Sequence, residues 1–156
     1  MVKVTITVDK SQLPHLSEKM PEIAKRGLHL AGQGLLGELT KNSPVDNGLL
    51  RQWFIETMTD SEIHIKTPAG YAKWVNDGTG VYNGGGIIRP KNGKFLVFKP
   101  GKKWNGPVTQ SGKLKGFVVL RYSRGQRGQK FVEKSIEATR ARIGGYFKIA
   151  IREVLS

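Results

Sequence analysis

The side chains that could support acid–base or nucleophilic chemistry are few in this chain. It has three histidines, His15, His29 and His64, and no cysteine. A serine or threonine nucleophile needs a base beside it, and none of these histidines lies in a recognisable nucleophile motif. Metal sites place histidine, cysteine or carboxylate ligands at short spacings such as H-E-x-x-H, and no such spacing occurs here. We therefore interpret the histidines as surface or packing residues, and predict no catalytic residue, no metal-binding residue and no enzymatic activity.

Two glycine-containing stretches resemble cofactor motifs in their letters only. Residues 32–37 spell G-x-G-x-x-G, but the dinucleotide fingerprint requires a strand before it and a helix that begins there. Here the motif falls inside a helix that has already begun, where glycines favour close helix packing. The stretch from Gly106 to Lys113 is one residue too long for a phosphate-binding P-loop, and Leu114 stands where serine or threonine should bind magnesium. We predict no cofactor-binding residue and no cofactor.

The first secondary-structure elements that the sequence predicts are a strand and a long helix. Apolar and polar residues alternate over residues 2–9, which predicts a half-buried strand. Residues 22–41 carry apolar side chains at helical spacing, which predicts an amphipathic helix. The four glycines of this helix each weaken it by roughly 1 kcal/mol relative to alanine. We expect a helix that keeps them to approach another backbone closely.

Beyond this helix the patterns predict both strands and helices. Four segments have the character of strands, the first two forming a hairpin: residues 50–58, 62–67, 94–99 and 117–122. A short helix is expected at residues 69–76. A second long helix is expected at residues 130–155, because its apolar side chains form one stripe at steps of three and four. Gly144-Gly145 is a candidate bend within it.

These elements together predict an α+β fold in a single domain, residues 1–156. The sheet, within residues 50–122, would be mainly antiparallel and packed by the two long helices, 22–41 and 130–155. Two glycine-containing segments, residues 79–90 and 100–116, are expected to be mobile loops. The second of them would form a long basic loop.

The positive charge of the chain lies entirely in its second half. Residues 1–78 contain nine Lys/Arg and nine Asp/Glu, whereas residues 79–156 hold the whole net charge of +14. No acidic residue occurs between Asp77 and Glu133, although twelve basic ones do. Such a block is typical of a surface that meets something acidic. The residues expected to form this basic interaction surface are Lys99, Lys102, Lys103, Lys113, Lys115, Arg121, Arg124 and Arg127.

The kind of acidic partner is left open by the residues themselves. A membrane is disfavoured, because the charge is concentrated in loops and strands rather than on an amphipathic helix, and no apolar run approaches about 18 residues. Nucleic acid fits, because Trp104 and Phe117 lie among the cations. No known nucleic-acid-binding motif accompanies them, however, so only non-specific contact is indicated. An acidic protein surface explains the block equally well.

Four short motifs follow one another along the chain. They are SPVDNGLLR at residues 43–51, YAKWVNDGT at 71–79, KFLVF at 94–98 and GQKFV at 128–132. In this order and spacing they resemble the minor tail components of long-tailed bacteriophages, a family known for neck, head–tail joining and tail-completion proteins. The chain departs from the family pattern in several places. Asn47 and Asn76 replace Thr and Glu, the proline before the last helix is missing, and the long basic insert is unusual.

The resemblance implies a structural virion protein of the head–tail junction. Copies would form a ring, with a hexamer favoured, that joins the capsid connector to neighbouring tail proteins and lets DNA pass with non-specific contact. The protein would reside in the tail or neck of a virion assembled in the bacterial host cytoplasm. The motif residues expected to shape its loops are Pro44, Asp46, Gly48, Tyr71, Trp74, Gly78 and Thr79. The alternative is a non-specific nucleic-acid-binding module that uses the basic segment 79–132.

Overall fold

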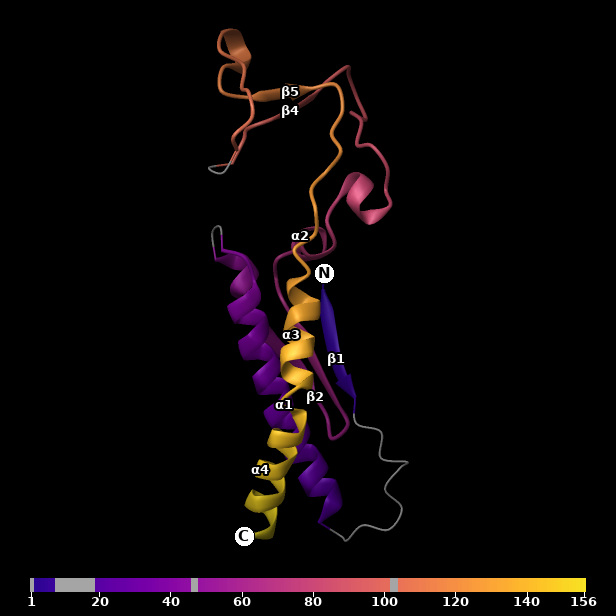
Figure 1. Ribbon diagram of the computed structural model, residues 1–156, viewed down its shortest axis with the longest axis vertical. Coiled ribbons are helices and arrows are strands. Elements are labelled where there is room, and N and C mark those ends of the chain that lie inside the picture. Colours follow the sequence, from indigo (N-terminus) through magenta and orange to yellow (C-terminus); the bar gives the residue numbers. More distant parts are fainter. Residues whose placement is uncertain (1, 8–18, 46–47, 102–103) are drawn as a thin grey trace. The chain divides into compact units, whose positions relative to one another are not determined.

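The computed structural model describes residues 2–7, 19–45, 48–101 and 104–156 (Figure 1). The chain divides into two compact units. Unit 1 comprises residues 1–76 and 130–156, and unit 2 comprises residues 77–129. The chain therefore leaves unit 1 after a short helix, forms unit 2 as an insertion, and returns to unit 1 for its C-terminal helices.

Unit 1 contains a three-stranded antiparallel sheet in the order β1-β3-β2. Its strands are β1 (Lys3–Thr7), β2 (Phe54–Met58) and β3 (Glu62–Lys66). The two-residue alternation of β3 buries Ile63 and Ile65 completely. The expected N-terminal strand and the hairpin are therefore confirmed. The hairpin begins later than expected, because Leu49–Arg51 forms a 3₁₀ turn instead of the first part of β2.

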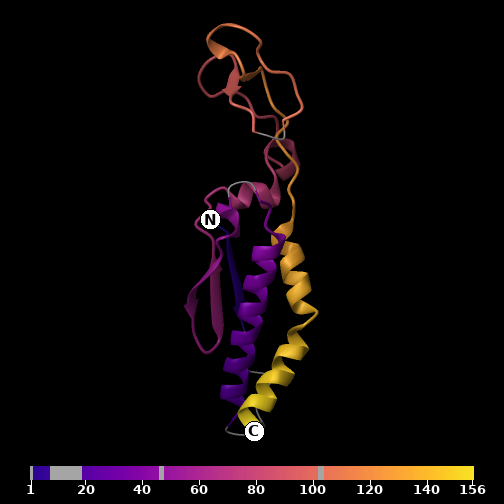
Figure 2. The ribbon, with the colours of Figure 1, turned by 90° about the vertical axis from the view of Figure 1, so that its left-hand side faces the viewer.

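Helix α1 (Met20–Asn42) runs beside this sheet (Figure 2). The stripe expected from the sequence is confirmed, because its apolar members are all buried: Ile23, Leu28, Ala31, Leu35 and Leu39. Leu28, Leu35 and Leu39 belong to the same hydrophobic core as the β3 isoleucines. Burial of this stripe, rather than intrinsic propensity, stabilises a helix that contains four glycines.

Three glycines of α1 allow other elements to approach its backbone. A Cβ added at Gly27 would lie 2.7 Å from the ring of Phe147, and one at Gly34 would lie 2.2 Å from the hydroxyl of Tyr146. Both aromatic residues belong to the C-terminal helix. A Cβ at Gly32 would similarly meet the sheet. The close approach is made by side chains rather than by the other backbone that the sequence led us to expect, and a Cβ added at Gly37 would meet nothing within 4 Å. The G-x-G-x-x-G stretch lies within α1.

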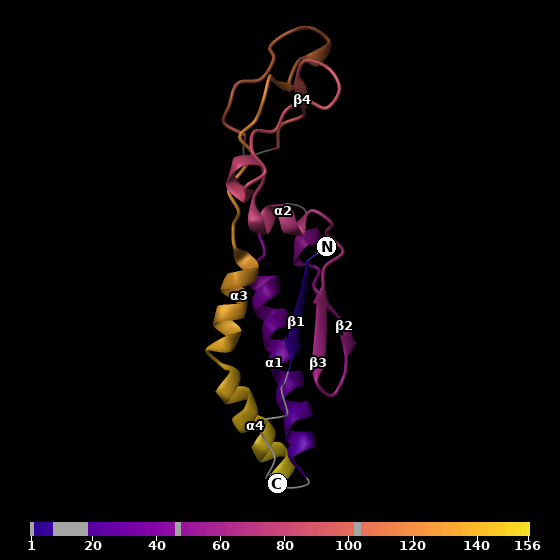
Figure 3. The same cartoon turned by 90° about the vertical axis from the view of Figure 1, so that its right-hand side faces the viewer.

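The C-terminal helix is not the single long helix expected over residues 130–155. It is divided into α3 (Phe131–Arg140) and α4 (Ile143–Leu155), as Figure 3 shows. The backbone N–H groups of Arg142 and Gly145 bond three residues back, which tightens the turn and interrupts the α-helical ladder. Gly144-Gly145 lowers helix propensity just beyond the break. The Arg142 side chain, at the break, donates to Glu38 Oε1 of α1 at 2.8 Å.

Unit 2 contains a separate two-stranded antiparallel sheet of β4 (Leu96–Phe98) and β5 (Val118–Leu120). The strands expected in one sheet are thus divided between two small sheets, because β4 and β5 pair with each other. Among the hydrophobic side chains described in unit 2, only Val118 is fully buried. The expected mobility of residues 79–90 and 100–116 stays a prediction.

The remaining helix, α2 (Ala72–Asp77), ends where unit 1 gives way to unit 2. The α+β class is confirmed, with four helices and two small antiparallel sheets in the described part of the chain. No helix among the described residues is long and apolar enough to cross a membrane.

Candidate functional site

The first motif ends α1 and fixes a tryptophan in the core of unit 1. Ser43 is buried at the C-terminus of α1, where its hydroxyl donates to the Leu39 carbonyl oxygen at 2.7 Å. The same hydroxyl accepts a hydrogen bond of 2.8 Å from Trp53 Nε1. The Trp53 ring packs edge to face on Phe131, with centroids 6.4 Å apart. Trp53 therefore links the end of α1 to the start of α3.

The second motif supplies an N-terminal cap for α3 from outside that helix. Asn76 is 5% exposed, and its Oδ1 accepts a 2.9 Å hydrogen bond from the backbone N–H of Val132. Its carbonyl oxygen accepts another from the N–H of Lys130. These N–H groups lack partners inside the helix. Where the family pattern has Glu, Asn76 thus provides an equivalent acceptor.

Replacement of Asn76 by alanine removes this cap. We expect Asn76→Ala to lower the free energy of unfolding by about 1–2 kcal/mol, because a buried helix N–H loses its acceptor. Asn76→Asp should keep most of the stability, since a carboxylate accepts the same bond and interacts favourably with the helix N-terminus. Urea unfolding followed by circular dichroism checks both values. Equal losses in the two variants would contradict the capping role.

The end of the second motif pairs with residues 124–126, near the other end of unit 2. The N–H of Thr79 donates to the Gln126 carbonyl oxygen at 2.9 Å, and the N–H of Val81 donates to that of Arg124 at 3.0 Å. The Thr79 hydroxyl oxygen accepts from the Gln126 N–H at 3.1 Å. Gly78 has φ +86°, and a Cβ there would lie 2.6 Å from the Gln126 carbonyl oxygen. Gly78 and Thr79 therefore allow two distant segments to pair closely.

The other motif residues are more exposed. Trp74 is 57% exposed on α2, whereas Tyr71, three residues earlier, packs against the core of unit 1. Pro44 is half-buried, and Gly48 adopts φ +82° before the 3₁₀ turn. Asp46 lies outside the described residues. The motif residues thus divide into one group that holds the fold and one, led by Trp74, that faces solvent.

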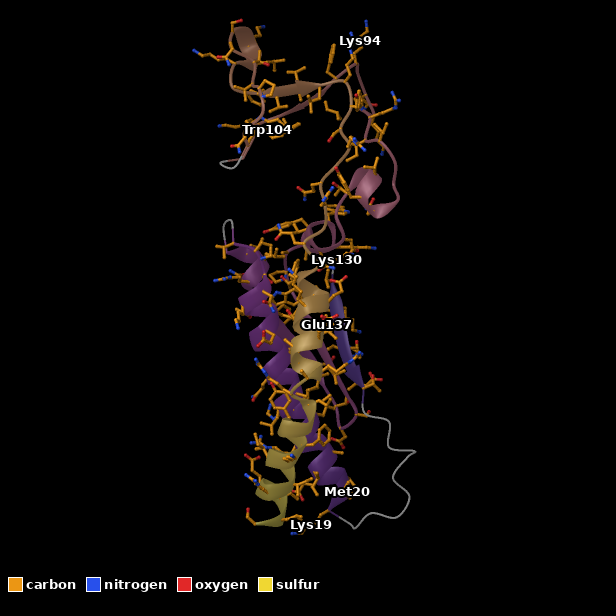
Figure 4. All side chains as sticks on the ribbon, viewed as in Figure 1. Lys19, Met20, Lys94, Trp104, Lys130 and Glu137 are labelled. Atoms are coloured by element: carbon orange, nitrogen blue, oxygen red, sulfur yellow. The ribbon has the colours of Figure 1, made fainter. Side chains whose placement is uncertain are left out.

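The basic residues expected to form an interaction surface all lie in unit 2. Lys102 and Lys103 are outside the described residues; the other members are exposed, namely Lys99, Lys113, Lys115, Arg121, Arg124 and Arg127. Exposed aromatic side chains lie in the same unit, including Phe95 and Trp104, the latter labelled together with Lys94 in Figure 4. Unit 2 therefore presents cations and aromatic rings together.

The histidines have ordinary polar partners. His29 contacts Arg26 and Gln33 on α1, and His64 pairs with Glu62 at 3.2 Å; His15 lies outside the described residues. His29 also lines a cavity of about 480 Å³ between α1, the β2–β3 turn and α4. In this cavity a hydrogen bond from Arg26 lowers the pKa of Glu153 below its usual value. No group of metal-ligating side chains is present among the described residues.

The sequence gives little indication of the roles of Trp53 and Asn76, which connect the first two motifs to the core of unit 1. Trp53 lies two residues after the first motif, between Gln52 and Phe54, and its position gives no periodic pattern. Asn76 stands out only as a departure from the family pattern. Helix α3 begins with no cap of its own, because its preceding residue, Lys130, makes no side-chain capping bond. That missing cap is the available signal for an acceptor elsewhere in the chain.

These features describe a scaffold with glycine-dependent loops and an exposed basic surface. Residues 10–78, somewhat less than half of the chain, match the family described as Bacteriophage HK97-gp10, putative tail-component. This range includes the first motif and the second as far as Gly78. The predicted resemblance to phage tail components is thus confirmed, and the match supports a structural, tail-related role. Comparison with curated proteins gave no match, and neither did comparison with solved structures.

Proposed function

We propose that this protein is a structural component of the phage head–tail junction, of the neck or tail-completion type. Copies of the chain close into a ring, with six favoured, that joins the capsid connector to the tail and lets DNA pass. The virion is its location, and assembly takes place in the host cytoplasm. The observation that carries the proposal is the match of residues 10–78 to a phage tail-component family.

Exposed hydrophobic side chains support assembly with other protein copies or with connector and tail proteins. Trp74 and Val45, both within family motifs, are 57% and 54% exposed. On α4, Ile149 and Leu155 are also exposed. Tryptophan is enriched among the residues that dominate protein interfaces. Apolar side chains gathered on a surface mark interaction sites more often than isolated ones do. Trp74 is therefore our first candidate for a contact between subunits.

Deletion of the gene from the phage that carries it tests this proposal. We expect negative-stain electron microscopy to show filled heads and separate tails that fail to join, with loss of nearly all plaque-forming particles. A plasmid copy of the wild-type chain should restore both. A Trp74→Ala copy should fold but restore them poorly, because it lacks the proposed contact. Normal tailed, infectious particles from the deletion phage would show that the protein has another role.

A further inference from the structure

The charge of the chain is concentrated in unit 2. Residues 77–129 contain eleven Lys/Arg and a single acidic residue, Asp77, for a net charge of +10. Unit 1 is larger, yet its fifteen Lys/Arg and eleven Asp/Glu give only +4. Every lysine and arginine side chain described in unit 2 is exposed. The repulsion among these cations is unfavourable unless an anionic partner is bound.

Basic side chains have different partners in the two units. In unit 1, several basic side chains are paired with carboxylates, as in Lys25–Asp60 at 2.9 Å and Arg142–Glu38 at 2.8 Å. None of the described lysines or arginines between residues 78 and 129 forms such an ion pair within the described part of the chain. The described cations of unit 2 are therefore available for an external anion.

The kinds of cation favour a polyanion over a protein surface. Residues 89–127 supply seven lysines and four arginines. Lysine is depleted at protein–protein interfaces, whereas lysine and arginine are both used to neutralise nucleic-acid phosphates. No carboxylate side chain occurs between residues 78 and 129, so the segment carries one sign of charge throughout. An evenly anionic backbone matches this surface best.

Several aromatic rings of unit 2 already have partners within the chain. Single strands bind by stacking unpaired bases on aromatic faces. In unit 2, Phe98 and Trp104 pack edge to face with centroids 5.7 Å apart. Arg127 lies 5.6 Å above the centre of the Tyr82 ring. These contacts take up part of the surface of three rings, whereas Phe95 and Tyr122 stay exposed. Phosphate contact by the exposed cations needs no free ring and is the contact that a duplex offers.

We infer that unit 2 is a sequence-independent binding surface for double-stranded DNA, which its exposed lysines and arginines hold by the phosphate backbone. The proposed function supplies the setting on which this inference rests, because DNA passes the head–tail junction. Contacts of this kind weaken steeply with salt and leave DNA free to slide. They are therefore compatible with a DNA molecule that must move past the protein.

Fluorescence anisotropy with the purified full-length protein tests this surface. The probe is a fluorescein-labelled duplex of mixed sequence, about 25 base pairs long, titrated at several NaCl concentrations. We expect the logarithm of the binding constant to fall linearly with the logarithm of salt, by about 0.9 per phosphate contacted. Lys113→Glu/Lys115→Glu should weaken binding at least about tenfold and make the slope shallower by about two.

A matched variant separates the location of the charge from its amount. Lys134→Glu/Lys148→Glu changes two exposed lysines of unit 1 and alters the net charge equally; we expect it to weaken binding less than the unit 2 variant. Equal losses, absence of wild-type binding at low salt, or tighter binding to a single-stranded oligothymidine would overturn the inference. Absence of binding would leave an acidic protein as the partner of unit 2. Such a result leaves the deletion phenotype, and so the proposed function, unaffected.

Discussion

Replacement of Trp53 by alanine is expected to lower the free energy of unfolding by about 3–5 kcal/mol. The side chain is 7% exposed and contacts both Ser43 and Phe131. Its removal leaves a cavity between the end of α1 and the start of α3, and it takes away the N–H that Ser43 accepts. For a chain of this size the melting temperature should fall by roughly 6–20 °C. Thermal unfolding followed by circular dichroism measures the change.

Trp74 provides the matched control for Trp53. It belongs to the next motif but is 57% exposed, so Trp74→Ala should change stability by no more than about 0.5 kcal/mol. Trp53→Phe keeps most of the ring and loses the N–H, and we expect an intermediate loss. If the two alanine variants melted at the same temperature, the assignment of Trp53 to the core and of Trp74 to the surface would be wrong.

Gly125→Ala is expected to disrupt the pairing of residues 79–81 with residues 124–126 in unit 2. Gly125 has φ +86°, and a Cβ there would lie 2.1 Å from the Thr79 carbonyl oxygen. The left-handed conformation alone costs an L-residue about 1–2 kcal/mol. The added Cβ clashes with backbone atoms of Thr79 and Gly80, which cannot rotate away as a side chain could. The two segments must therefore separate, which weakens the hydrogen bond from the Val81 N–H to the Arg124 carbonyl oxygen. Amide hydrogen exchange at Thr79 and Val81 should become markedly faster.

Gly112→Ala isolates the conformational part of this cost. Gly112 also lies in unit 2 and has φ +74°, but no other described atom lies within 4 Å of its added Cβ. We expect Gly112→Ala to lower the free energy of unfolding by about 1–2 kcal/mol or less and to leave amide exchange at Thr79 and Val81 unchanged. Similar exchange rates in the two variants would contradict a role for close backbone approach at Gly125.

Local patterns in the sequence predict most helices and strands, but they do not predict how these elements divide between the two units. The stripe of α1 and the alternation of β3 follow from side-chain periodicity, so both could be predicted. The division into two units could not, because strand pairing between distant segments carries no local signal. Gly144-Gly145 marks a candidate bend in the sequence, but the break lies just before it, at Arg142, where no local pattern places it. An arginine continues a helix readily by itself, and here its side chain bonds to Glu38, which is remote in sequence.

The candidate site shows the same limit. The spacing of the motifs leads to the phage resemblance, and the charge pattern by itself identifies the basic segment. What each motif residue does depends on partners far along the chain. Asn76 is a clear example, because its side chain caps a helix that begins more than fifty residues later. Sequence alone presents it as the last residue of a short helix, with no sign of the helix that it caps.

Cryo-electron microscopy of intact virions tests the place of this chain in the particle most directly. We predict density at the head–tail junction in which repeated copies of unit 1, recognisable by α1 packed against α3 and α4, form a closed ring around the DNA path. Density for the chain at the tail tip or along the tail tube would contradict the proposed position. Infectious virions that contain no copy of the chain would contradict the structural role itself.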